Sequence, residues 1–225
     1  FIFLTFFILI ILFVDNNLIL KELRLFILKK SISVDIFQIF LTTLFILLYL
    51  NAFNMFDGIN LQSGIYSITV LSFYYIGVSN AFVIIPLIIF FFIFLFFNQK
   101  KNVFLGNSGS LLISFLISYY FIKSYNLGHI NYSESIYIFM CIPGLDMFRL
   151  FIERILKNKN PFKGDNNHLH HILLRNVGFI KTTIIIQFLI FSLIYISLFH
   201  SILISIILSL ISYSFILIIY RSRNN

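Results

Sequence analysis

Three polar segments interrupt a strongly apolar sequence, and each carries residue types that can do chemistry. In the first, Asn51, Asn54 and Asp57 recur at every third position, which places them along one stripe of a helix. Two amides and a carboxylate are expensive at the end of an apolar helix in lipid. The stripe therefore predicts a polar pocket at the membrane interface that binds a metal or a nucleotide. Ordinary helix termination by Asp57 and the glycine after it is the alternative.

The second segment, FLGNSGS at 104–110, precedes an apolar stretch. Glycines and serines at the start of a helix leave several backbone N–H groups open to a phosphate. The ring of Phe104 is suited to stacking on a base. A serine N-cap with glycine spacers fits the same residues nearly as well, so this segment alone does not separate a phosphate site from an ordinary helix start.

The third segment, GDNNHLHH at 164–171, holds His168, His170 and His171 close to Asp165 in a basic stretch. Clustered histidines can bind a metal, transfer protons or donate hydrogen bonds to phosphate oxygens. The surrounding lysines and arginines favour an anionic ligand, and the ligands for a zinc site are too few. If the stretch is helical, His168 and His171 share a face and His170 points elsewhere. A solvated basic loop would explain the lysines but not three histidines.

The elements that must position these segments are membrane-spanning helices. Of 225 residues, 60% are hydrophobic and 11% are charged, and the mean hydropathy is +1.01. A soluble domain needs more charge to cover its surface, whereas about 20 apolar residues cross a bilayer as a helix. We expect an all-α bundle, one integral-membrane domain over 1–225, with a short hairpin or interfacial segment at 15–35. About eight spans are expected, near 1–14, 36–53, 63–79, 81–98, 108–123, 134–153, 182–199 and 201–220.

Lysines and arginines orient this bundle, because cytoplasmic connections carry an excess of them. They gather at 99–107, at 154–181 and in the carboxyl-terminal tail, whereas the 123–133 connection holds only Lys123. The connector at 15–35 is an exception, with basic residues partly offset by acidic ones. This assignment makes 154–181 a cytoplasmic basic loop that contains the histidines, and it places all three polar segments on one membrane face. The sequence shows no basic stripe of the kind that binds nucleic acid.

Asp146 and Arg149 lie three residues apart inside the span expected at 134–153 and should pair on one helix face. Charged residues inside a membrane are functional candidates. A structural pair that orients the following segment is an equal alternative.

Three stretches together resemble a known family: NAFNMFDGIN at 51–60, FLGNSGS at 104–110 and PGLDMFRLFIERILKNKNPFKGDNNHLHH at 143–171. They are similar to the polyprenyl-phosphate N-acetylhexosamine-1-phosphate transferases. The HLHH form, preceded by a Pro-Phe pair and Asp165, is closer to the undecaprenyl-phosphate GlcNAc-1-phosphate transferases than to the phospho-MurNAc-pentapeptide transferases. The resemblance follows motif order over essentially the whole chain, which is similar to the later spans of the family, as in an amino-terminally truncated member.

The resemblance implies transfer of a sugar 1-phosphate from a UDP-N-acetylhexosamine to a polyprenyl phosphate, at the cytoplasmic face of the bacterial inner membrane. The expected partners are these two substrates and membrane lipid, with no nucleic acid, and a homodimer is left open. The expected cofactor is Mg²⁺, with Mn²⁺ as a substitute. The implied roles are metal binding by Asn54 and Asn107, nucleotide-sugar contacts by Asn51, Asn60, Phe104 and Gly106, and catalysis by Asp57, His168, His170 and His171.

Three departures from the family pattern bear on activity. The family usually has Asp where Asn107 stands, so a metal ligand loses its charge and metal affinity should fall. The family also often has Asp at the position of Asn60. The paired aspartates expected upstream are missing, and the nearest match, Asp15-Asn16, falls on the opposite membrane face. We therefore expect this fragment alone to be inactive.

Two other functions remain open. A transporter or flippase requires charged or broken helices near the bilayer midplane. A catalytically impaired relative would follow if Asn107 reports lost metal binding.

Overall fold

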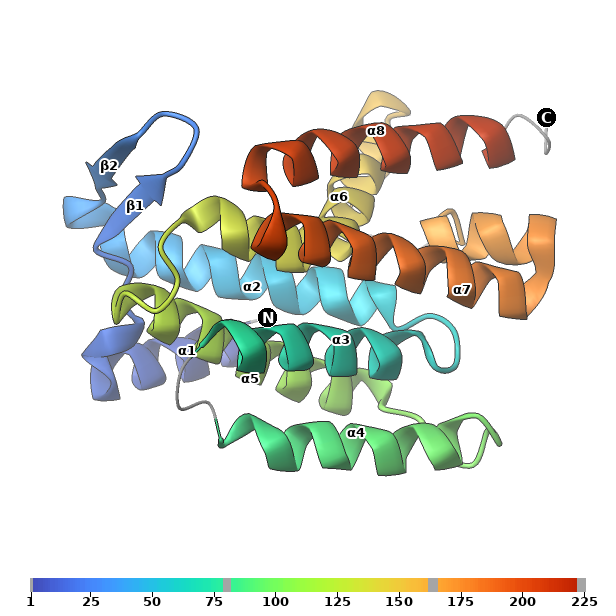
Figure 1. Ribbon diagram of the computed structural model, residues 1–225, viewed down its shortest axis with the longest axis horizontal. Coiled ribbons are helices and arrows are strands. Elements are labelled where there is room, and N and C mark those ends of the chain that lie inside the picture. Colours follow the sequence, from blue (N-terminus) through green and yellow to red (C-terminus); the bar gives the residue numbers. More distant parts are fainter. Residues whose placement is uncertain (1, 79–81, 162–165, 222–225) are drawn as a thin grey trace.

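The computed structural model describes residues 2–78, 82–161 and 166–221. Over these residues the chain forms eight α-helices that run back and forth in alternate directions (Figure 1). This confirms the all-α membrane bundle expected from the apolar runs. The helices are α1 (Ile2–Val14), α2 (Gln38–Phe56), α3 (Gln62–Gly77), α4 (Ile84–Asn98), α5 (Gly106–Asn126), α6 (Ser133–Leu156), α7 (Leu169–Phe199) and α8 (Ile202–Arg221).

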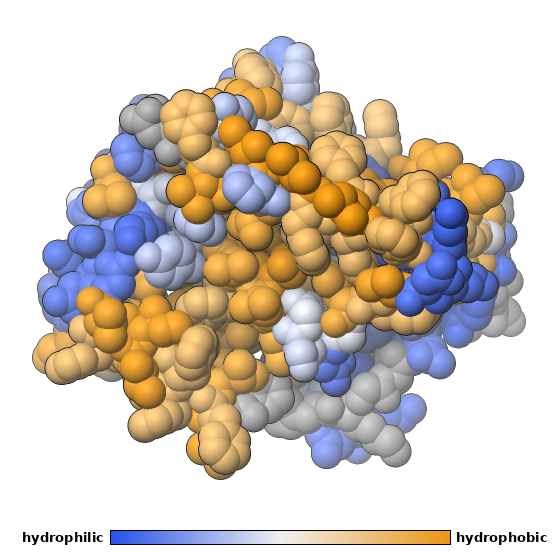
Figure 2. Space-filling view, turned by 90° about the horizontal axis from the view of Figure 1, so that it is seen from below, coloured by the Kyte–Doolittle hydropathy of each residue, from blue (hydrophilic) through white to orange (hydrophobic). Residues whose placement is uncertain are grey.

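Four of the described helices are long and apolar enough to cross a membrane: α6, α7, α8 and the segment Asp35–Phe56 that contains α2. The helices α1 and α4 are shorter but also apolar. Figure 2 shows hydrophobic side chains over the middle of one face and hydrophilic ones mainly toward its two ends. Large side chains such as Phe3, Phe92 and Phe188 are exposed on the surface of the bundle. So much exposed apolar surface is stable only in contact with lipid. The protein is therefore a membrane protein.

Helix α5 packs against α2, and one of its faces is buried inside the bundle. Ser110, Ser114 and Ser118 repeat every fourth residue on its buried face. Each serine hydroxyl donates to a carbonyl of the preceding turn, so these buried groups keep a hydrogen-bond partner. Small residues at such positions allow membrane helices to approach closely.

The hairpin expected at 15–35 is present at one end of the bundle, on the left in Figure 1. Strands β1 (Glu22–Leu25) and β2 (Lys30–Ser33) pair antiparallel, with Glu22 opposite Ser33 and Leu25 opposite Lys30. The Arg24 guanidinium donates to the carbonyls of Tyr125 and Ile130, which fixes the hairpin to the end of α5. We call this the hairpin end.

Asp15 also lies at the hairpin end, as expected from counting spans. Its carboxylate accepts hydrogen bonds from the Lys123 ammonium at 2.7 Å and from the Tyr119 hydroxyl at 2.9 Å. These contacts, the Lys123 bond foremost, hold the pKa of Asp15 below its usual range. Asp15 is therefore bound within a local network, away from the polar segments at the other end.

The opposite end holds the α2–α3 connection, the α4–α5 connection and the start of α7, on the right in Figure 1. We call it the site end. Within the connection expected at 154–181, the chain is helical from Leu169 onward. Gly178, with φ 78° and ψ 174°, breaks the helical geometry inside α7, and only glycine adopts that conformation readily. Residues 169–177 thus form a short helical segment, which Gly178 separates from the rest of α7.

Candidate functional site

A polar cavity of about 220 Å³ opens at the site end, between the α2–α3 and α4–α5 connections. We call it the inter-loop cavity. Its lining residues are Asn54, Asp57, Gly58, Ile59, Asn60, Asn98, Phe104, Leu105, Gly106 and Asn107. The first two polar segments of the sequence therefore meet, as predicted. Asn51 lies one turn deeper in α2 and is not among the lining residues.

Asp57 both ends α2 and lines the cavity, so helix termination and a polar pocket at this position are compatible. Its backbone N–H donates to the Phe53 carbonyl at 3.0 Å as the last bond of the helix. The Ser63 hydroxyl donates to the Asp57 carboxylate at 2.5 Å. Burial raises the pKa of Asp57 to about 6, with the Ser63 hydrogen bond acting in the opposite direction. The side chain is therefore mostly ionised at neutral pH and places a negative charge at the cavity.

Helix α5 begins at Gly106, where φ is 61°, and its amino-terminal residues line the cavity. The serine N-cap considered as the alternative for this segment is not present: Leu105 precedes the helix and no side chain caps it. The Ser110 hydroxyl, which is also 3.1 Å from the Asn107 carbonyl oxygen, makes its shorter hydrogen bond to the Asn54 side-chain oxygen at 2.5 Å, which ties α5 to α2. The positive end of a 21-residue helix, with its unpaired backbone N–H groups, thus lies at the cavity.

Asn98 is a lining residue that the sequence interpretation missed. Only 4% of it is exposed. Its side-chain oxygen accepts from the Leu61 N–H at 2.7 Å, and its side-chain nitrogen donates to the Val103 carbonyl at 2.7 Å. Asn98 thereby joins the two connections that form the cavity. The signal in the sequence is its position, because Asn98 begins the polar run NQKKN directly after an apolar span.

The three histidine rings form one group, which we call the histidine trio. The ring centroids of His168 and His170 are 5.4 Å apart, those of His170 and His171 4.2 Å, and those of His168 and His171 6.3 Å. The expectation that His170 points away from the other two is wrong. His168 has an extended backbone, with φ −62° and ψ 152°, and precedes the helix, so helical periodicity does not govern its direction.

The histidine trio stands against the wall of the inter-loop cavity. A methyl group added at Gly58 would lie 2.1 Å from Nε2 of His170, so ring and backbone are in direct contact. His170 is 1% exposed. All three polar segments of the sequence therefore lie at one end of the bundle, although the trio is not itself part of the cavity lining.

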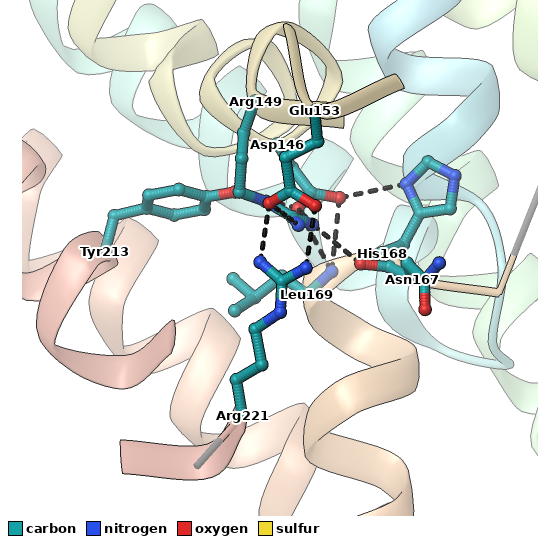
Figure 3. A network of polar contacts seen from close by, with 8 residues as sticks. All are labelled: Asp146, Arg149, Glu153, Asn167, His168, Leu169, Tyr213 and Arg221. Atoms are coloured by element: carbon teal, nitrogen blue, oxygen red, sulfur yellow. Dashed lines mark hydrogen bonds and ion pairs between the residues drawn. The ribbon is translucent and has the colours of Figure 1, made fainter. Parts of the chain in front are cut away.

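Asp146 connects the trio to the rest of the bundle (Figure 3). Its carboxylate lies 2.9 Å from Nδ1 of His168 and accepts from the Leu169 N–H, from the Tyr213 hydroxyl at 2.8 Å and from the Arg149 guanidinium at 2.8 Å. The predicted pairing of Asp146 with Arg149 is confirmed. The interactions with His168 and Tyr213 were not foreseen.

A second carboxylate extends this network outward. Glu153 accepts from Arg149 at 2.9 Å and from both terminal nitrogens of Arg221, at 2.6 and 2.8 Å. The network thus unites α6, the start of α7 and the end of α8 (Figure 3).

The donor groups at the cavity bear on magnesium binding. In the part of the chain that is described, no group of three or more His, Cys, Asp or Glu residues is arranged to hold a metal. The cavity offers one carboxylate, Asp57, and the side-chain oxygens of Asn54 and Asn107. Mg²⁺ usually keeps several waters and binds through one or two carboxylates together with substrate phosphates, so this donor set fits a weak site completed by substrate. Asp165, Phe162 and Lys163 lie outside the described residues.

Fold and site together define a class: a polytopic helical membrane protein with a polar cavity at one end, beside a helix amino terminus and clustered histidines. Residues 2–125 match the family model described as Glycosyl transferase family 4. The chain belongs to this family.

Relatives carry a shared description, "undecaprenyl-phosphate alpha-N-acetylglucosaminyl 1-phosphate transferase". The protein so named from Thermotoga maritima is 34% identical over 163 residues, covering 69% of this chain and 51% of that protein. One from Escherichia coli O157:H7 is 28% identical over 181 residues, covering 74% and 48%. One from Pasteurella multocida is 38% identical over 81 residues, covering 35% and 22%. The chain spans about half the length of the first two relatives. No solved structure matches it.

Proposed function

We propose that the complete protein transfers N-acetylhexosamine 1-phosphate from a UDP-sugar to a polyprenyl phosphate, as the opening step of a cell-envelope polysaccharide. The observation that carries this proposal is the meeting of the α2 end, the α5 start and the histidine trio at one end of a membrane bundle. Membership of the family and the shared name of the relatives support the choice of sugar and lipid.

The proposed reaction joins two anions. An oxygen of the lipid phosphate attacks the β-phosphorus of the UDP-sugar, the bond from that phosphorus to the bridging oxygen breaks, and UMP leaves. Catalysis of such a transfer depends on positioning and on groups that stabilise charge on phosphate oxygens. The α5 amino terminus and the histidine trio are groups of this kind. Phe104, 63% exposed at the cavity, offers a ring on which uracil can stack.

A divalent cation fits the same proposal. Mg²⁺, or Mn²⁺ in its place, would be held by Asp57, Asn54 and Asn107, and would neutralise diphosphate charge when bound. Asn60 and Gly106 also line the cavity, and we assign both to contacts with the nucleotide sugar. Asn51 is assigned a supporting place behind Asn54 instead of a direct contact.

We place the site end in the cytoplasm of a bacterial inner-membrane protein. Basic residues accumulate at this end and favour that side: Lys100, Lys101, Lys157, Lys159, Arg175 and Arg221. At the hairpin end, Arg24 and Lys123 pair with Glu22 and Asp15, which reduces the net positive charge there. A nucleotide sugar then enters from the cytoplasm, while the lipid phosphate arrives along the membrane.

A transporter or flippase is disfavoured by the position of the buried charges. Asp146 accepts a hydrogen bond from the first residue of α7, and Glu153 binds the last residue of α8. Glu153 therefore lies near the site end of α6, and Asp146, although it is near the middle of that helix, lies level with the start of α7 instead of midway along it, where an alternating pathway would need it. An impaired relative remains the second candidate, because Asn107 stands where a charged metal ligand is expected.

The test uses membranes that contain the complete protein, supplied with undecaprenyl phosphate and radiolabelled UDP-GlcNAc. We expect a lipid-linked product that requires magnesium. His171→Ala should reduce its formation at least about a hundred-fold, whereas His200→Ala, at the hairpin end of α7, should leave it unchanged. No product with any UDP-N-acetylhexosamine from folded protein would overturn the proposal. Movement of lipid across vesicles without a product would favour a flippase.

A further inference from the structure

We infer that Asp146 is a positioning residue, which fixes the ring of His168 and the start of α7 for the transfer reaction. This inference rests on the proposed function, but the geometry behind it does not. Asp146 sits on α6, outside the inter-loop cavity, and reaches the site only through the histidine trio.

The contact with His168 determines which ring nitrogen carries the proton. Nδ1 of His168 lies 2.9 Å from Oδ2 of Asp146, and both residues are 6% exposed. An ionised carboxylate only accepts hydrogen bonds, so Nδ1 must be the donor. In the neutral ring this leaves the lone pair on Nε2, which is then free to accept a proton or, once protonated, to donate to a phosphate oxygen. A carboxylate behind a histidine plays this orienting part in other enzymes.

Asp146 is itself held firmly, which an orienting group requires. Arg149 and Tyr213 each donate to Oδ1 at 2.8 Å. A buried charge is costly unless it is paired and fully hydrogen-bonded, and these donors meet that condition. Tyr213 belongs to α8, so this helix supports the histidine trio without any of its residues lining the cavity.

The same carboxylate also sets where α7 begins. The Leu169 N–H donates to Oδ1 at 3.1 Å and to Oδ2 at 3.2 Å. His168, which precedes the helix, makes no side-chain capping bond. Asp146 therefore acts as the acceptor for the first helical N–H from a different helix, and it determines the placement of His170 and His171 as well as the ring of His168.

The variant Asp146→Asn separates positioning from simple support of the fold. Its side-chain oxygen can still accept from Leu169 and Tyr213, but its NH₂ group would face His168 and force the opposite tautomer. In the complete protein we expect kcat to fall about a hundred-fold or more, with little change in KM for UDP-GlcNAc. Glu153→Gln is the matched control: it removes a carboxylate from the same network that contacts Arg149 but not His168. It should stay within about threefold of wild type.

A double-mutant cycle tests whether Asp146 acts through His168. If it does, adding Asp146→Asn to His168→Ala should cause no further loss beyond about twofold, because the group that it orients is already gone. Losses that multiply would show that Asp146 only supports the fold and would overturn the inference.

A measurement without turnover keeps the inference separate from the proposed function. In the complete protein with ¹⁵N-labelled histidine, NMR should show His168 protonated at Nδ1, with a proton shifted downfield by the carboxylate, and Asp146→Asn should abolish that signal. A wild-type protein with His168 protonated only at Nε2 would overturn the inference. If the Nδ1 signal is present but no lipid-linked sugar forms, the proposed function fails while the geometry of the pair stands.

Discussion

The backbone of Gly58 lies directly against the imidazole ring of His170. A Cβ atom at position 58 would be 2.1 Å from Nε2 and 2.7 Å from Cε1 of that ring. The connection that follows Asp57 and the start of α7 thus form one continuous wall. Through this contact the cavity between the connections and the histidine trio become a single site.

Gly58→Ala should disrupt that wall. The added methyl group cannot fit against the ring, so the connection or the histidine must move, at a cost of about 1–3 kcal/mol. We expect lipid-linked product formation by the complete protein to fall at least about tenfold, since small misplacements in a site are costly. Gly77→Ala is the control, because nothing lies within 4 Å of its added methyl. Equal effects of the two substitutions would contradict direct contact at Gly58.

Asp57→Asn should make the protein more stable above pH 6. The pKa of Asp57 is about 6 in the folded protein and near 4 in an unfolded chain, so the folded state binds the proton more tightly. The stabilisation that this provides is complete below about pH 4 and is lost as the pH rises through 6. The variant should therefore exceed wild type by about 1–3 kcal/mol at pH 8, and the difference should shrink toward pH 4.

Thermal unfolding in detergent at several pH values measures this difference. Asp15→Asn gives the opposite sign, because Lys123 holds the pKa of Asp15 low, so its carboxylate stabilises the folded state above the unfolded pKa. If Asp57→Asn changes the unfolding temperature by the same amount at pH 4 and pH 8, burial does not destabilise the ionised Asp57 carboxylate.

Asn107→Asp should strengthen magnesium binding in the complete protein. A second carboxylate at the cavity adds charge where Asp57 is the only acidic lining residue, and ligand charge raises affinity for hard cations. We expect the magnesium concentration for half-maximal product formation to fall on the order of tenfold. Asn102→Asp, in the same connection but outside the cavity lining, should leave it unchanged. Equal shifts in both variants would place the cation elsewhere.

Replacing Arg149 should destabilise the protein much more than replacing Arg221. Arg149 is 12% exposed and faces the buried Asp146, so Arg149→Met leaves a buried charge with one partner fewer and should cost about 2–4 kcal/mol. Arg221 is 43% exposed, and Arg221→Gln should cost no more than about 1 kcal/mol. Unfolding midpoints in detergent compare the two variants, and equal losses would contradict the burial of the Asp146–Arg149 pair.

The sequence predicted much of this arrangement because membrane helices obey simple rules. Apolar runs located the helices, and counting spans placed Asp57, Gly106 and the histidines at one end and Asp15 at the other. The direction of His170 was predicted wrongly, because helical periodicity was applied across His168, where the backbone is extended. The contacts of Asp146 with His168 and Tyr213 could not be predicted, because they join residues far apart in the sequence and no local sequence pattern indicates such contacts.

Photolabelling with 5-azido-UDP-N-acetylglucosamine tests most directly that the α2–α3 and α4–α5 connections form one nucleotide-sugar site. The complete protein is irradiated with the probe, with and without excess UDP-N-acetylglucosamine, and the labelled peptides are sequenced. Labelling should fall within 57–60 and 104–107, should be blocked by the competitor and should weaken in Phe104→Ala. Competitor-sensitive label in the 15–35 hairpin, at the opposite end of the bundle, would contradict the account.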